Sequence, residues 1–91
     1  MKKPLQGGRL AVLRRRVDVL DRRIVLLLGM RQRLVAAMRP FKSRLRDARR
    51  EAAILALVAR QAGRAGLDRT FVRGVYRALL AASRSFLRRS A

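Results

Sequence analysis

The sequence predicts an all-α protein of three helices, the first of them very long. Apolar residues recur at alternating three- and four-residue spacing, no segment alternates in the manner of a strand, and glycine, proline and aspartate separate the periodic segments. At 91 residues the chain fits one small domain. Because Pro4 and the pair Gly7-Gly8 lie near the start, we expect a disordered leader at residues 1–9 and a single helical domain at residues 10–91.

The first helix is predicted over residues 10–38. Its apolar residues form an a/d seam: Leu10, Leu13, Val17, Leu20, Ile24, Leu27, Leu34 and Met38. Arg31 occupies a seam position, where a buried guanidinium needs an anionic partner. Such a helix is about 44 Å long, whereas a compact chain of this length is only about 30 Å across. One chain cannot cover the seam, so we expect an intertwined helical homodimer.

A second helix is predicted after Pro40, which ends or kinks the first one. A short basic connection spans residues 41–46, and Asp47 is the expected N-cap of the second helix. Gly63 and Gly66 are expected to end it.

The third helix is expected to begin at Asp68, its N-cap, with Leu67 as the hydrophobic staple. Its apolar stripe consists of Val72, Val75, Tyr76, Leu79 and Phe86. Ser83 interrupts this stripe, as Arg31 interrupts the seam of the first helix.

Basic residues dominate the charge of the chain. There are 24 Lys+Arg against 5 Asp+Glu, a formal net charge of +19, which predicts attraction to polyanions or to an anionic small molecule. The arginines are spread over every predicted helix, and most aromatic residues fall on apolar stripes, so a base-stacking surface is not indicated. We interpret most single arginines as solvated surface residues.

Missing residue types exclude several kinds of chemistry. Without cysteine there is no disulfide or thiolate metal site, and without histidine the usual general base is absent. The 5 acidic residues do not favour a metal enzyme or a carboxylate-dyad hydrolase, so we expect no metal. The longest uncharged apolar run, residues 24–30, is too short to cross a bilayer. No apolar signal segment follows the basic start, so we expect a cytoplasmic protein with no membrane partner.

The residues that do not fit the helix pattern suggest a site. They combine cations with one carboxylate and one hydroxyl, which suits a small dianion with a hydroxyl group: Arg31, Lys42, Arg50, Glu51 and Ser83. Arg14 and Arg31 are separated by about 17 residues, or about 25 Å of helix, too far for one small ligand. Antiparallel pairing of two first helices brings Arg14 of one chain towards Arg31 of the other, so we expect a site shared between subunits.

In this order the residues resemble a known family. The pattern Leu13-Arg14-x-x-Val17-x-x-Leu20-Asp21-x-x-Ile24-x-x-Leu27-Leu28-x-x-Arg31, then Lys42, Asp47-x-x-Arg50-Glu51, Gly66-Leu67-Asp68 and Ser83, is similar to the small all-α chorismate mutases. The similarity runs from about Leu10 to Leu87. It implies an isomerase, an intertwined dimer that rearranges chorismate to prephenate in the shikimate pathway of aromatic amino acid biosynthesis. The resemblance implies neither a cofactor nor a covalent intermediate. A pericyclic step needs a compact conformer and well-placed charges rather than an acid or a base.

The resemblance also implies a role for each site residue. Arg14 from the second chain and Arg31 hold the two substrate carboxylates, with Ser83 assisting. Lys42 donates to the ether oxygen, where negative charge develops as the C–O bond breaks. Glu51 takes the ring hydroxyl.

The remaining positions of the implied site lie on the second and third helices. Asp47 binds the ring hydroxyl together with Glu51, and Arg50 shapes the pocket. Leu87, flanked by Arg84 and Arg88, stands where the family has a glutamine or glutamate that donates to the ether oxygen. Loss of one such donor costs on the order of 3 kcal/mol of transition-state stabilisation. We therefore expect weak activity, help from another cation, or a related substrate.

Alternative functions remain open at this point. Isochorismate-pyruvate lyases resemble the mutases and share the Arg, Arg and Lys set, but typically have an apolar residue in place of Glu51, which favours a mutase. A mutase of 4-amino-4-deoxychorismate has the same site residues. A function of another class is a basic helical dimer that binds nucleic acid non-specifically. In a purely structural interpretation, Arg31 reaches the surface and the Ser83 hydroxyl bonds back to its own helix.

Overall fold

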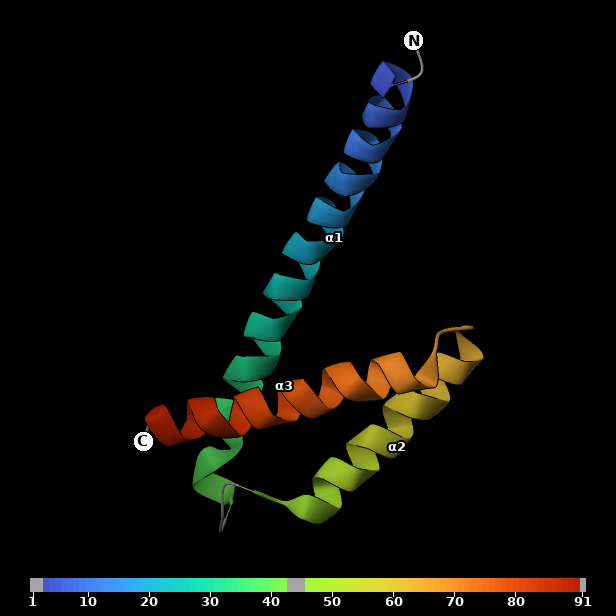
Figure 1. Ribbon diagram of the computed structural model, residues 1–91. Coiled ribbons are helices and arrows are strands. Elements are labelled where there is room, and N and C mark those ends of the chain that lie inside the picture. Colours follow the sequence, from blue (N-terminus) through green and yellow to red (C-terminus); the bar gives the residue numbers. More distant parts are fainter. Residues whose placement is uncertain (1–2, 43–45, 91) are drawn as a thin grey trace. The chain divides into compact units, whose positions relative to one another are not determined.

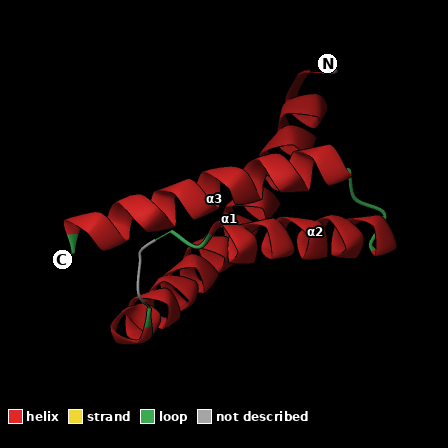
Figure 2. Cartoon of the chain, turned by 90° about the horizontal axis from the view of Figure 1, so that it is seen from below, coloured by secondary structure: helices red, strands yellow, loops and turns green. Residues whose placement is uncertain are grey.

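The computed structural model describes residues 3–42 and 46–90. These residues form α1 (Lys3–Met38), the short 3-10 helix η1 (Arg39–Phe41), α2 (Ala48–Arg64) and α3 (Arg69–Arg89) (Figure 1). The described residues contain helices and loops but no strand, as Figure 2 shows. The predicted all-α class with a long first helix is confirmed. Residues 1–2 of the predicted leader and residues 43–45 of the predicted basic connection lie outside the described residues.

The chain divides into two compact units. The first unit is Met1–Leu34, which carries most of α1. The second unit is Val35–Ala91, which contains the last residues of α1, then η1, α2 and α3.

α1 has 36 residues and is about 54 Å long at the α-helical rise. It begins at Lys3 rather than at residue 10, so residues 3–9 of the predicted leader are helical. Pro4 lies in the first turn, where a missing N–H costs no intrahelical hydrogen bond. Gly7 and Gly8 cost about 1 kcal/mol each relative to alanine but do not stop the helix. The division into a leader at 1–9 and a domain at 10–91 stays a prediction.

The apolar residues of α1 are exposed in the single chain. Those of the predicted seam, from Leu10 to Met38, have 47% to 68% of their surface exposed. The apolar surface is also wider than one seam, because residues 24–28 read Ile-Val-Leu-Leu-Leu and five consecutive helical positions cover every side of a helix. We call residues 24–28 the apolar belt. An apolar surface of this extent is larger than a helix that faces only water normally carries.

α2 and α3 pack against each other as an antiparallel helical hairpin (Figure 2). α2 contributes the buried residues Val58 and Ala62, and α3 contributes Leu80 and Leu87. These side chains recur at helical spacing on each helix, so each helix presents one apolar face to the hairpin. This hairpin core fixes the orientation of the polar residues that flank it.

Gly66 ends α2, as the sequence predicts. Its φ of 73° lies in the left-handed region, which glycine adopts without a Cβ clash. The Gly66 N–H donates to the Gly63 carbonyl at 3.2 Å, and the Leu67 N–H donates to the Ala62 carbonyl at 2.8 Å. These are the two hydrogen bonds of a Schellman motif. The helix continues one residue beyond Gly63, to Arg64.

Both predicted N-caps are confirmed. The Asp47 carboxylate accepts from the backbone N–H of Arg50 at 3.0 Å. The Asp68 carboxylate accepts from the N–H groups of Thr70 and Phe71 at 2.8 and 3.2 Å. Each cap satisfies backbone donors that the first turn of a helix leaves without an intrahelical partner.

A bilayer crossing needs a long and strongly apolar helix, and the described parts of the chain contain none.

Candidate active site

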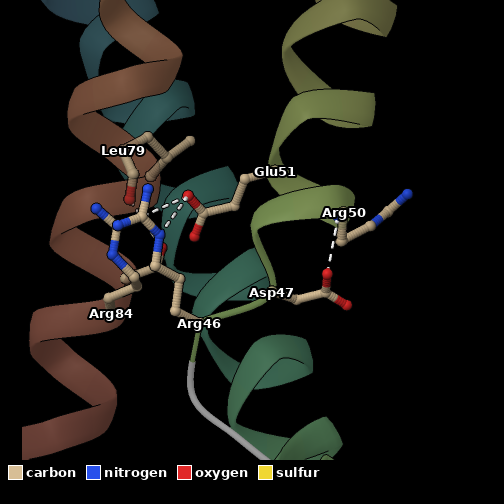
Figure 3. Close-up of polar contacts among 7 residues, drawn as sticks. Arg46, Asp47, Arg50, Glu51, Leu79 and Arg84 are labelled. Carbon is tan, nitrogen blue, oxygen red and sulfur yellow. Dashed lines mark hydrogen bonds and ion pairs between the residues drawn. The ribbon is translucent and has the colours of Figure 1, made fainter.

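A charge-assisted hydrogen bond joins α2 to α3 (Figure 3). Glu51 lies in the first turn of α2, and Nη1 of Arg84 on α3 donates to its Oε1 at 2.5 Å. The side chains of Arg84 and Glu51 are 22% and 17% exposed, so water screens the pair less than it screens a surface pair. A hydrogen bond to a charged group is worth about 1.5–3 kcal/mol. This pair therefore fixes the orientation of the Glu51 carboxylate.

Arg46 makes a second and weaker contact with the same carboxylate. Its Nε lies 3.9 Å from Oε1 of Glu51, and its side chain is 66% exposed. An exposed pair of this length contributes about 0–1 kcal/mol. Both of these contacts reach Oε1, and a carboxylate can accept several hydrogen bonds, so Oε2 of Glu51 can take a further donor such as a ligand hydroxyl.

Asp47 and Arg50 lie close to Glu51 in the sequence, and they form the N-cap hydrogen bond of α2. The Asp47 side chain accepts from the backbone of Arg50, and both residues are exposed. The Arg50 guanidinium points away from the Glu51–Arg84 pair (Figure 3). The structure therefore shows Asp47 as the cap that starts the helical turn carrying Glu51.

Ser83 is half-buried on α3, next to Arg84. Its hydroxyl donates to the carbonyl of Leu79, one turn earlier in the same helix, at 2.9 Å. This is the hydrogen bond that the purely structural interpretation of Ser83 predicts.

Leu87 belongs to the core of the hairpin, where it is 2% exposed. Its backbone carbonyl accepts from Nη1 of Arg39 at 2.7 Å. This carbonyl lies in the last turn of α3, where the helix itself supplies no donor, and a cation there also interacts favourably with the helix dipole. The structure therefore gives position 87 an apolar, structural environment.

The other predicted site residues lie on α1 and directly after η1. Lys42 is half-buried and has an extended backbone (φ −111°, ψ 136°). Its backbone N–H donates a hydrogen bond to the Arg39 carbonyl at 3.2 Å. Arg14 is exposed and Arg31 half-buried on α1, both in the first unit. At the α-helical rise, their spacing along α1 corresponds to about 25 Å.

The structure thus brings Glu51 together with Arg84 and Arg46, and it places Ser83 beside Arg84 on α3. Sequence reasoning named Arg84 only as a neighbour of Leu87 and did not pair it with Glu51. The sequence does contain a signal for this pair. α2 and α3 flank a short turn at residues 65–68, and in a helical hairpin residues at similar distances before and after the turn lie opposite each other. Glu51 and Ser83-Arg84 are at such similar distances.

No group of three or more histidine, cysteine, aspartate or glutamate side chains within the described segments has the arrangement to hold a metal ion.

Comparison with known proteins identifies the family to which the chain is similar. Residues 13–87 match the sequence model of the family described as chorismate mutase type II. The matched range includes every predicted site residue, from Arg14 to Leu87. No curated protein and no solved structure matches the chain.

Proposed function

The chain belongs to the chorismate mutase type II family, and on this premise we propose that it rearranges chorismate to prephenate. The family supports a function of the chorismate mutase type and a small-molecule substrate. The observation that carries the specific proposal is the Glu51 carboxylate, held at the start of α2 by Arg84 with only 17% of its side chain exposed. An oriented and partly buried acceptor suits the single hydroxyl of a ring that also carries two carboxylates.

The proposed reaction is intramolecular. The C–O bond of the enol ether breaks while a C–C bond forms, so all atoms stay in one molecule and no proton needs to pass through the protein. The protein contributes by holding the compact conformer and by stabilising the negative charge that develops on the ether oxygen.

In this proposal the cationic side chains bind the two carboxylates and the ether oxygen of the substrate. Arg31 and Arg14 of a second copy bind the two carboxylates, because a guanidinium fork matches a carboxylate with two parallel hydrogen bonds. Lys42 donates to the ether oxygen, where its charge acts more strongly in the transition state than in the ground state.

The groups on α2 and α3 bind the ring hydroxyl and help to bind one carboxylate. Glu51 accepts the ring hydroxyl through Oε2, and Asp47 supports it by capping the turn that carries it. Ser83 assists one carboxylate by turning its hydroxyl from the Leu79 carbonyl towards that carboxylate, and Arg50 shapes the pocket. Because Leu87 is a core residue without a side-chain donor, we expect a low rate.

We also propose that two copies pair through α1. The seam and the apolar belt are exposed in the single chain, and α1 is too long for a chain of this size to cover. Antiparallel pairing places Arg14 of one copy towards Arg31 of the other and so completes the carboxylate site.

The test is incubation of the purified protein with chorismate and, separately, with isochorismate, followed by identification of the products. We expect loss of the ultraviolet absorbance of chorismate and formation of prephenate. Release of pyruvate from isochorismate, without reaction of chorismate, would instead assign the lyase activity and overturn the proposal.

Variants separate this proposal from nucleic-acid binding. Arg31→Ala and Lys42→Ala should lose the activity and keep the helical circular dichroism spectrum, whereas Arg88→Ala, an exposed arginine on α3, should keep both. A non-specific nucleic-acid binder would show a steep salt dependence of binding and respond little to either of the first two substitutions.

A further inference from the structure

We propose that Arg84 is a positioning residue of the chorismate site: it holds the Glu51 carboxylate in the orientation that receives the ring hydroxyl. This inference rests on the proposed function. It adds to the implied site a residue that contacts Glu51 rather than the substrate (Figure 3).

The contacts of Glu51 favour Arg84 over Arg46 as the group that orients it. Arg84 donates at 2.5 Å with a side chain that is 22% exposed, whereas Arg46 lies at 3.9 Å with a side chain that is 66% exposed. A glutamate side chain has three rotatable bonds, and a loose, screened contact cannot select one rotamer. A short hydrogen bond to a largely buried guanidinium can select one rotamer of Glu51, because such a hydrogen bond is directional.

The position of Arg84 on α3 explains why its side chain is itself held in place. Arg84 precedes the buried Leu87 by one helical turn, so the two residues lie on the same side of α3. The apolar stem of the arginine can lie along the face that packs on α2, with the charged end at Glu51. The hairpin core thus orients Arg84, and Arg84 in turn orients Glu51.

The contact with Arg84 also leaves Glu51 able to bind a ligand. Both described contacts use Oε1, and Oε2 can accept the substrate hydroxyl. A carboxylate whose orientation is already fixed binds that hydroxyl without a further ordering cost. Removal of Arg84 should therefore weaken the reaction even though Arg84 contacts no substrate atom.

The experiment compares four variants with the wild-type protein. Arg84→Met keeps a long apolar stem without the charge, Arg84→Lys restores a charge, Glu51→Ala removes the carboxylate, and a double variant combines Arg84→Met with Glu51→Ala. Arg88→Met is the matched control, because Arg88 lies on the same helix and is exposed. The rate kcat and the constant KM for chorismate are measured well below each variant's Tm, and circular dichroism confirms the fold.

We expect Arg84→Met to lower kcat/KM by about tenfold to a hundredfold, the range for a misplaced catalytic group. Arg84→Lys should recover part of the loss, and Arg88→Met should match the wild type. The double variant should be no slower than Glu51→Ala alone, because no carboxylate remains for Arg84 to position.

Three outcomes would overturn the inference. If Arg84→Met lowers Tm but keeps the wild-type kcat/KM, the pair only joins the two helices. If the losses of the single variants multiply in the double variant, Arg84 acts independently of Glu51. If the wild-type protein does not consume chorismate, the proposed function fails and this inference fails with it, whereas either of the first two results leaves the proposed function intact.

Discussion

Replacing Leu87 by glutamine tests whether this position serves the core or the site. The family resemblance places a glutamine or glutamate here, whereas in this chain Leu87 is a buried residue of α3, only 2% exposed. The change removes apolar burial worth about 1.5–3 kcal/mol and buries an amide without a designed partner at a cost of about 1–3 kcal/mol. We expect the free energy of unfolding to fall by about 3–5 kcal/mol and the Tm to fall by more than about 10 °C.

Thermal and urea unfolding, followed by far-ultraviolet circular dichroism, measure this effect. Both proteins are compared at one concentration, because self-association makes apparent stability depend on concentration. Leu57→Gln on α2 is the matched control, since Leu57 is 43% exposed and its substitution should cost less than about 1 kcal/mol. The reasoning is refuted if Leu87→Gln is as stable as Leu57→Gln and turns over chorismate faster than the wild type. Such a result would place the side chain of residue 87 against the substrate.

Two further predictions concern the turn and the assembly. Gly66→Ala should destabilise the protein by about 1–2 kcal/mol, because the positive φ of Gly66 is unfavourable for a residue with a Cβ. Gly74→Ala within α3 should stabilise the protein by about 0.5–1 kcal/mol, because the added Cβ lies in open space. Equal free energies of urea unfolding for the two variants would contradict the turn geometry. Light scattering should give the mass of a dimer, and Leu27→Glu in the apolar belt should shift it to monomer or unfolded chain. A folded, monodisperse wild-type monomer would show that α1 does not need a second copy.

The ends of the shorter helices could be predicted because their signals are local. Asp47 and Asp68 each accept hydrogen bonds from backbone groups two or three residues later in the chain. Gly66 adopts a conformation that its own lack of a side chain permits. Residue type alone therefore identified these boundaries.

The start of α1 and the partner of Glu51 could not be predicted in the same way. A proline near the start of the chain is typical of a disordered leader, but proline is also common in the first turn of a helix, so Pro4 alone does not distinguish the two. The Glu51–Arg84 pair depends on how far α3 folds back along α2, which the periodicity of either helix leaves undefined. The N-cap Asp47 places Glu51 in the first turns of the second helix, but it does not identify the arginine that Glu51 contacts.

The hydrogen bond from Arg39 to the Leu87 carbonyl has a consequence for local opening. The last turn of an isolated helix frays, since its carbonyls have no helical partner. Here one of those carbonyls is bonded to a residue 48 positions earlier, directly after α1. Opening of the last turn of α3 breaks the hydrogen bond between Arg39 and the Leu87 carbonyl. The backbone amides near Arg39 and those in the last turn of α3 should therefore gain and lose protection from hydrogen exchange together.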